Sequence, residues 1–414
     1  MEKISSLLRP RRSHVELARK VDYRAQKLTL AQRMQIVSRR DRMGRTKPGW
    51  MRVLCAALAL LLVLIVGNSL HTRALSRSVA KAEPRGENEI RLSFAGDLML
   101  GRYVQTYGEK ESYAELFAPI EPLFKASDFV FANLECAVLS GEPDEAQAAD
   151  KLVLSAREDA LRAAVDAGIN VFALANNHAA DYGRSALQKT TEMIDALGVT
   201  YAGAGENWEE APKYRVLEKD GFKIGFLSCT DTIPKGFSAN KDGFGVATSK
   251  NYRVFQNLNR AARECDLTVV YVHWGKEDIT AVTDRQRELA HRLISSGADV
   301  VIGSHPHVLQ EVEQYQTRNR SGIIFYSLGN FVFDQGQRPS RNTVLAQLDV
   351  DRTTGAGSFT LIPMHLENFH PFVTDNSLYC GQIRNIMTDE LPKSAYSVMG
   401  DGRIEIPVQF DLTK

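Results

Sequence analysis

The chain has 414 residues, of which 44% are hydrophobic and 24% charged, so it is too apolar to be mainly disordered and long enough for one large or two medium domains. The net charge of +1 hides an asymmetry, because residues 1–52 hold 15 Lys or Arg against 4 Asp or Glu and everything after them is net −10. The basic segment has no nucleic-acid-binding motif, so we interpret it as a basic cytoplasmic tail and expect no nucleic-acid partner.

An uncharged apolar run at residues 53–67 separates this tail from the rest of the chain. The run reaches about 20 residues when Trp50 and Leu70 are counted as interfacial ends, which is the length that a helix needs to span a bilayer. A buried helix of a soluble domain normally keeps a polar face, and this run has none. We therefore predict a transmembrane anchor at residues 53–70.

The basic residues before the anchor predict its orientation. They place the N-terminus in the cytoplasm and the C-terminal bulk outside it, so we expect a single-pass protein of the cell membrane that contacts the lipid bilayer. Residues 71–89 are polar and charged, as in a linker. A cleaved signal peptide is the alternative, but the 52 residues before the apolar run are too many for an ordinary signal.

Beyond the linker, strand-like and helix-like patterns alternate. The predicted strands in this part are 90–95, 129–132, 170–175, 199–202, 214–218 and 222–228, and the predicted helices are 113–126, 157–167 and 185–197. Asp220 and Gly221 give a hairpin turn between the last two strands.

The second half continues the alternation and then changes. Helices at 252–264 and 284–296 are interleaved with strands at 267–272 and 300–302, which indicates the α/β class. Strand-like runs then follow without helices and predict an antiparallel addition to the sheet, at 322–328, 344–350 and 358–366. From Pro371 the signal weakens to one possible strand at 403–410, so we assign residues 90–370 to the folded domain and 371–414 to a C-terminal extension.

Two carboxylates stand at the ends of predicted strands. Asp97 follows the strand 90–95, and Glu135 follows the strand 129–132. In an α/β chain the loops at strand ends gather at one crevice, so residues far apart in sequence can converge there. Carboxylates bind hard and borderline divalent cations, and we predict that Asp97 and Glu135 are metal ligands.

Amide and imidazole groups stand at the ends of three further strands. Asn177 can bind a metal through its amide oxygen while the neighbouring His178 stays unligated to handle protons. His273 closes the strand 267–272. Pro306 keeps its segment extended, so the imidazoles of His305 and His307, two residues apart, are expected to point to the same side.

Together the predicted ligands have nitrogen and oxygen donors: Asp97, Glu135, Asn177, His273, His305 and His307. The set is too large for one tetrahedral ion, so we expect one or two divalent ions of manganese, iron or zinc. Four further residues are predicted to orient the ligands or to contact the substrate: Arg102, Asn133, Glu277 and Asn330. Glu277 has the alternative role of an exposed loop acid, and Asn330 that of a strand-to-turn residue.

Six motifs in this order resemble those of the CapA family, the poly-γ-glutamate capsule biosynthesis proteins, whose domain is related to calcineurin-like metallophosphoesterases. They are GDLMLGR at 96–102, NLE at 133–135, ANNHAADYG at 175–183, HWGKE at 273–277, GSHPHV at 303–308 and SLGNFVFD at 327–334. The resemblance implies a four-layer α/β/β/α sandwich, here preceded by one transmembrane helix. It also implies that His178 takes the place of an unligated catalytic histidine.

The sequence departs from the metallophosphoesterase pattern at three positions. Met99 stands where a histidine ligand is usual, Glu135 where an aspartate usually bridges two metals, and Ala179 where an acid usually follows the catalytic histidine. These departures bear on whether a second metal is held and on whether the protein is an ordinary phosphatase.

Two functions of different class follow from the sequence. In the first, the protein is a membrane-anchored, extracytoplasmic part of a machine that makes or exports poly-γ-glutamate or another envelope polymer, with membrane synthesis proteins as partners. In the second, it is a stand-alone metal-dependent hydrolase of phosphoesters or cell-wall polymers. A non-catalytic scaffold is a third reading.

Overall fold

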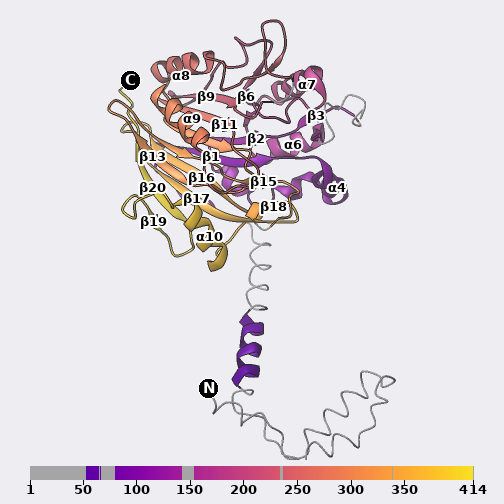
Figure 1. Ribbon diagram of the computed structural model, residues 1–414, viewed down its shortest axis with the longest axis vertical. Helices are drawn as coiled ribbons and strands as arrows, with labels where there is room; N and C mark the ends of the chain where they lie inside the picture. The colour runs from indigo at the N-terminus through magenta and orange to yellow at the C-terminus, as the bar shows by residue number, and fades with distance from the viewer. Residues whose placement is uncertain are drawn as a thin grey trace, which may run out of the picture. The chain divides into compact units, whose positions relative to one another are not determined.

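The computed structural model describes residues 53–64, 66, 80–141, 153–233, 236–337 and 339–413, and Figure 1 shows how the helices and strands of residues 80–413 are arranged. Residues 53–64 and 66, inside the predicted anchor, are helical. Within the described residues no helix is both long and apolar enough to cross a membrane. The predicted tail, the rest of the anchor and residues 71–79 of the predicted linker lie outside the described residues, so the anchor stays a prediction.

The larger of two main sheets has ten strands in the described part of the chain, with the central order β19-β20-β17-β16-β1-β2-β5-β6. Its strands are β1 (Glu89–Leu98), β2 (Phe129–Leu134), β5 (Val171–Ala173), β6 (Thr200–Ala202), β15 (Asn330–Val332), β16 (Asn342–Asp351), β17 (Ala356–Glu367), β18 (His370–Val373), β19 (Ser397–Val398) and β20 (Ile404–Gln409). Strands β1, β2, β5 and β6 are parallel to one another, whereas β16 and β17 are antiparallel neighbours. The carboxyl ends of the parallel strands therefore share one edge.

The second main sheet has the order β13-β14-β12-β11-β9-β8. Its strands are β8 (Arg215–Lys219), β9 (Phe222–Thr230), β11 (Leu267–His273), β12 (Val300–Ser304), β13 (Val312–Gln316) and β14 (Ser321–Phe325). Strands β9, β11, β12 and β14 are parallel. The predicted hairpin between β8 and β9 is confirmed, with Asp220 and Gly221 at φ 48° and 81° in its turn.

The two main sheets face each other across a shared apolar core. At its centre the Phe131 ring contacts the rings of Phe94, Phe226 and Tyr271, with centroids 4.9, 5.2 and 6.3 Å away. A separate core covers the outer face of the first sheet under α4 (Arg102–Glu111), α5 (Glu121–Lys125), α6 (Glu158–Asp166) and α7 (Gly183–Ala196). A third core lies between the second sheet and the helices α8 (Arg253–Glu264) and α9 (Asp284–Ser295). The order of layers is helices, sheet, sheet, helices, so the predicted α/β class is confirmed.

Two short pairs of strands and the remaining helices complete the described elements. The pairs are β3 (Ala137–Leu139) with β4 (Ser155–Arg157), and β7 (Ala204–Gly205) with β10 (Gly245–Val246). Helix α10 (Ser377–Met387) packs against β16 and β17, and η5 (Pro339–Arg341) leads into β16.

The predicted helix at 113–126 is wrong as a single element. The structure has a 3₁₀-helix, η3 (Tyr113–Leu116), followed by α5, and the sequence pattern missed α4. Pro122 lies in the first turn of α5, where its missing N–H is tolerated. A continuous helix would have placed Pro119 and Pro122 in its interior, where proline removes a hydrogen bond and clashes with the preceding turn.

The predicted antiparallel addition is correct only in part. Strands β16 and β17 are antiparallel in the first sheet, but β14, from the run at 322–328, pairs in parallel with β12 in the second sheet. The chain crosses between the sheets after β14, because β15 pairs with β1. Periodicity within a strand does not encode which sheet the strand joins.

The folded domain extends beyond the predicted limits of 90 and 370. At its start, the Glu83 carbonyl accepts a hydrogen bond from the buried Arg91 at 2.7 Å, and Arg85 pairs with Asp128. At its end, β20 pairs with β17, and Ile404 and Ile406 are buried in the core between the sheets. The C-terminal segment gave a weak signal because both residues of β19 are exposed and only Ile404 and Ile406 of the six residues of β20 are buried.

We predict that Phe131→Ala lowers the free energy of unfolding by about 3–5 kcal/mol, because it empties the centre of the core between the sheets. Urea unfolding monitored by circular dichroism measures the change. Val216→Ala, at an exposed position of β8, is the control and should change stability by about 0.5 kcal/mol or less. Equal effects of the two changes would contradict a shared core.

Candidate metal centre

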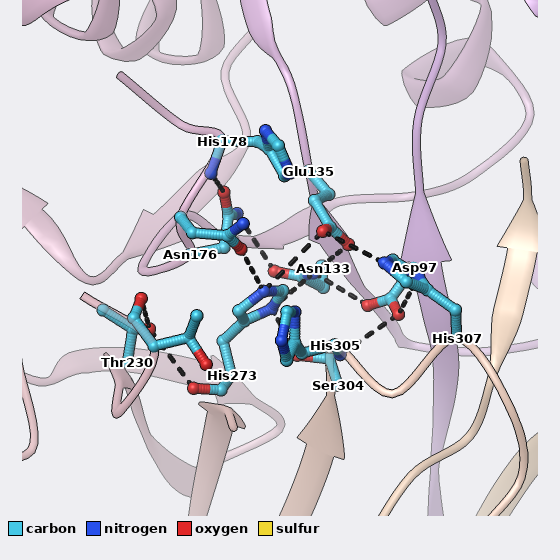
Figure 2. Close-up of polar contacts among 12 residues, drawn as sticks. Asp97, Asn133, Glu135, Asn176, His178, Thr230, His273, Ser304, His305 and His307 are labelled. Atoms are coloured by element: carbon cyan, nitrogen blue, oxygen red, sulfur yellow. Dashed lines mark hydrogen bonds and ion pairs between the residues drawn. The ribbon is translucent and has the colours of Figure 1, made fainter. Parts of the chain in front are cut away.

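The predicted site residues converge at the carboxyl ends of parallel strands from both sheets (Figure 2). Asp97 lies near the end of β1, and Glu135 directly follows β2. The segment that holds Asn177 follows β5, whereas His273 and Ser304 are the last residues of β11 and β12. The common direction of these strands therefore brings five distant segments together.

Two close backbone approaches set the shape of this edge. A Cβ atom on Gly96 would lie 1.9 Å from the Gly329 carbonyl oxygen, and one on Gly303 would lie 2.0 Å from the Tyr326 oxygen. Only glycine fits at such distances. The pairing of β1 with β2 shifts register before Asp97, whose N–H donates to the Gly329 carbonyl at 3.0 Å. This local irregularity re-aims the Asp97 side chain.

Asp97 is fully buried and its carboxylate connects three segments. One oxygen, Oδ1, accepts a hydrogen bond from Asn133 Nδ2 at 2.8 Å. The other, Oδ2, accepts one from the His305 backbone N–H at 3.2 Å and lies 3.2 Å from His307 Nδ1. Asn133 therefore orients the Asp97 carboxylate.

Glu135 is also fully buried, but one of its oxygens has no hydrogen-bond partner among the described residues. That atom, Oε1, lies 3.7 Å from His273 Nε2 and 3.6 Å from His307 Nε2. Burial raises the pKa of Glu135 well above its usual range, and the Asp97 carboxylate adds to the rise, while His307 opposes it. A buried carboxylate with an unpaired oxygen is costly, and a cation beside Oε1 would remove that cost.

Two histidines on the other side of Glu135 are held in their neutral form. Burial, followed by the neighbouring His305, lowers the pKa of His273 well below its usual range. Burial also lowers the pKa of His305 to about 4, and its Nδ1 has no hydrogen-bond partner among the described residues. Neutral imidazole is the form that binds metals. His273 Nε2 lies 2.6 Å from Asn177 Oδ1, so both predicted ligands point at the same place.

His307 lies between the two carboxylates. Burial lowers its pKa, but the Glu135 and Asp97 carboxylates outweigh burial and raise it to about 10. Its Nδ1 also lies 2.9 Å from Asn330 Oδ1, which places Asn330 behind a predicted ligand. A proton on His307 compensates the acids here, and an ion bound to the same groups would take over that role and release the proton.

The segment that carries His305 and His307 is not extended as predicted. Their φ angles are +96° and +58°, in the left-handed region that side chains other than glycine rarely adopt. The imidazoles converge through this strained backbone, with ring centroids 5.8 Å apart, rather than by alternation along a strand. Such strain is typical of functional sites, where the surrounding structure imposes it.

The ligand atoms fall into two buried groups of three, each with all atoms within 4.8 Å of one another. The first contains Asp97, Glu135 and His307, and the second contains Glu135, His273 and His305. Glu135 belongs to both, so the residues fit two ions that share one carboxylate. The unpartnered atoms Glu135 Oε1 and His305 Nδ1 are the structural observations that support this fit.

His178 lies beside the ligand groups but belongs to neither. Its Nδ1 is 2.7 Å from Asp181 Oδ2, and its backbone N–H donates to Asn176 Oδ1 at 3.0 Å. Asp181 Oδ2 in turn accepts a hydrogen bond from the Leu154 N–H at 2.7 Å. A carboxylate that accepts from one imidazole nitrogen leaves the other free to exchange a proton. The partnership with Asp181, three residues along, was visible in the sequence but was not assigned.

Two residues of the first motif lie outside the ligand groups. The Met99 side chain is buried in the outer core, and its sulfur accepts the Gly101 N–H at 3.1 Å. It is therefore not a replacement for a histidine ligand. Arg102 lies at the start of α4, where its Nε pairs with Asp334 Oδ2 at 3.1 Å. Sequence reasoning also missed Ser304 and Asn176, which contact His273 and His178.

Comparison with known proteins shows clear relatives in sequence. The family described as "Bacterial capsule synthesis protein PGA_cap" matches residues 91–335. The chain is 31% identical to "Capsule biosynthesis protein CapA" of Bacillus anthracis, over 87% of this chain and 88% of that protein. It is 34% identical to "PGA biosynthesis protein CapA" of Bacillus subtilis (strain 168), over 70% of this chain and 75% of that protein.

Comparison with solved structures gives more distant similarity. One of them is the crystal structure of a 5′-nucleotidase precursor from Thermus thermophilus. It is 12% identical in sequence, has a TM-score of 0.36, and is matched over 64% of this chain and 52% of that one.

We predict that replacing both His305 and His307 with Ala removes the bound metal from the purified full-length protein, because each buried ligand group loses an imidazole. Elemental analysis measures the metal content, and circular dichroism checks the fold. His291→Ala is the matched control, because His291 pairs with Glu313 at 2.8 Å outside the ligand groups.

Single changes sharpen this test. Glu135→Gln should lower the binding affinity for both ions, because Glu135 belongs to both ligand groups. Asp97→Asn should lower the affinity only for the ion in the group that contains Asp97. Unchanged metal content in the His305 and His307 double variant would remove the site as described.

Proposed function

This chain belongs to the PGA_cap family of bacterial capsule synthesis proteins, and we propose that it acts in the synthesis or export of poly-γ-glutamate through a divalent-metal site outside the cytoplasm. Family membership supports the capsule context. The observation that carries the metal chemistry is the buried Glu135 carboxylate, which is shared by two ligand groups and has one oxygen without a hydrogen-bond partner among the described residues. The four layers around it correspond, in this proposal, to a metallophosphoesterase-like sandwich.

The donor set determines which ions fit. Carboxylate, amide and imidazole donors without a thiolate suit manganese, iron or zinc. One or two such ions would polarise a carboxylate, amide or phosphoryl oxygen of the substrate and stabilise negative charge that develops there. Asn133 and Asn330 keep Asp97 and His307 in the positions that ligation requires.

His178 is the proposed catalytic residue. Asp181 fixes its ring through Nδ1, so Nε2 is the nitrogen that exchanges a proton with the substrate or the leaving group. The residue is buried, at 8% exposure, and follows Asn177, whose Oδ1 lies 2.6 Å from His273 Nε2. His178 can therefore act next to the ligand groups without occupying a coordination position.

Arg102 is the proposed contact for an acidic polymer. The part of the chain after the predicted anchor is net negative, so long-range attraction of a polyanion is weak and recognition must be local. Asp334 holds Arg102 through Nε, which leaves the terminal guanidinium nitrogens for a carboxylate. Phe333, next to Asp334, contacts the His307 ring at 4.8 Å between centroids, so this pair borders the metal centre.

A stand-alone metal-dependent hydrolase of phosphoesters or wall polymers is the second candidate. Two ligand groups that share one carboxylate, with a free histidine beside them, favour it, because two ions can hold both the attacking and the leaving oxygen of a displacement. If neither polymer production nor diester hydrolysis depends on His178 in the test below, a non-catalytic scaffold is the remaining function.

We predict that His178→Ala lowers activity about 100-fold or more while the metal stays bound, because a proton-transfer residue is lost and no ligand is. Two readouts are needed: surface polyglutamate in a host that lacks its own copy of the gene, and hydrolysis of phosphodiesters by the purified full-length protein. His291→Ala serves again as control. Loss of polymer without diester turnover supports the capsule role, and turnover in a host without polymer supports the hydrolase.

If His178→Ala behaves like the wild type in both readouts, the catalytic proposal is wrong. Asp181→Asn gives an independent check. It keeps the size of the side chain but weakens the hold on the imidazole, so it should reduce activity less than His178→Ala does.

The proposed location outside the cytoplasm predicts a protease result. Protease added to intact cells, after the wall is opened, should degrade the domain beyond residue 71 and spare a tag at the N-terminus, because basic residues precede the apolar run at 53–67. Immunoblots against tags at both ends measure this. A protected C-terminal domain would contradict the proposed topology.

A further inference from the structure

Glu277 is an exposed acid whose carboxylate reaches the buried metal centre. One of its oxygens lies within 4.8 Å of ligand atoms on both His305 and His307. Among the described residues, none lies within ion-pair or hydrogen-bond distance of this carboxylate.

The loop that carries Glu277 is fixed in place and does not simply project into solvent. The Asp278 N–H donates to the Pro306 carbonyl at 2.9 Å, which ties the loop to the segment between the two histidines. On the other side, the Trp274 ring is buried and its Nε1 donates to the Tyr326 carbonyl at 2.9 Å. Gly275 and Asp278 adopt φ angles of +88° and +60° that turn the chain between these two anchors.

The distance of Glu277 from the imidazoles argues against a hydrogen-bonding role. An acceptor that orients an imidazole lies about 2.7–3.2 Å from its nitrogen, and Glu277 makes no such contact. His307 already has Asn330 and Asp97 at its Nδ1. Two ligands of one ion, in contrast, do not touch each other, and the ion fills the space between them.

The motif at residues 96–102 supplies only Asp97 as a ligand, so an ion bound there needs a further donor. The ion of the group formed by Asp97, Glu135 and His307 has three side chains, all from the buried side. Met99 supplies none, because its sulfur binds a backbone N–H in the outer core. Divalent manganese, iron and zinc take at least four ligands, so each buried group needs a further donor, and Glu277 lies in a third group with His305 and His307, one residue from each buried group.

We propose that Glu277 is a carboxylate ligand of a divalent ion at the mouth of this centre, supplied from the solvent side next to His305 and His307. The inference rests on the proposed metal site and adds a third carboxylate to it. A ligand on the open side is also the one that an incoming carboxylate or phosphate of the substrate can displace with the least change in the buried groups.

The test measures metal binding rather than activity. Glu277→Gln keeps the size of the side chain and removes its charge, and Mn²⁺ titration of the metal-free full-length protein by calorimetry gives the number and affinity of the ions. We expect at least one ion to bind about tenfold or more weakly than in the wild type. Tenfold is the lower end of the loss of metal affinity seen when residues that support metal ligands are replaced. Glu277→His, which supplies another donor, should restore part of the affinity.

Asp278→Asn is the matched control. It removes the same charge from the neighbouring residue of the same loop, and asparagine tolerates the positive φ. Equal weakening by Asp278→Asn would show a general charge effect and overturn the inference, as would unchanged Mn²⁺ binding by Glu277→Gln. If the wild type binds no metal at all, the proposed metal site itself fails, which is a distinct result.

Discussion

The burial of the Glu135 carboxyl group, with one oxygen that has no hydrogen-bond partner among the described residues, is the constraint on which the arrangement of this centre depends. A carboxylate this deeply buried is tolerated only if positive charge or hydrogen-bond donors surround it. Asn133 lies 3.4 Å from its Oε2, and two imidazoles approach its Oε1. These partners come from β2, β11 and the segment after β12, so the need to compensate one carboxylate links the two sheets at their carboxyl ends.

The position of the site could be predicted from sequence because it follows from strand direction alone. Buried apolar runs that end in Asp97, Asn177 or His273 place these side chains at one edge once the strands are parallel. The same argument works within each sheet and says nothing about how two sheets face each other. Strand ends predicted that Glu135, His273 and His307 converge, but the individual contacts of Glu135 with both histidines depend on how the two sheets pack.

Local geometry is what the sequence left open. Pro306 suggested an extended segment, yet the flanking histidines have positive φ, because the Asp97 carboxylate accepts the His305 N–H and the Asp278 N–H donates to the Pro306 carbonyl. Likewise, the sequence shows Met99 where a histidine ligand is usual but not where its side chain lies, and the structure packs it in the outer core. Both outcomes are set by tertiary contacts that strand periodicity does not contain.

If the proposed site holds an ion, the strained turn at His305 and His307 links metal supply to the lifetime of the protein. Without an ion, the chain bears the cost of two left-handed residues and a buried, poorly compensated acid. In the proposed site, an ion that binds only the folded state offsets this cost by mass action, by about 2.7 kcal/mol when its concentration is about 100 times the dissociation constant. Cells short of the ion would then hold a larger unfolded fraction for proteases to remove, so the abundance of the protein would follow metal availability.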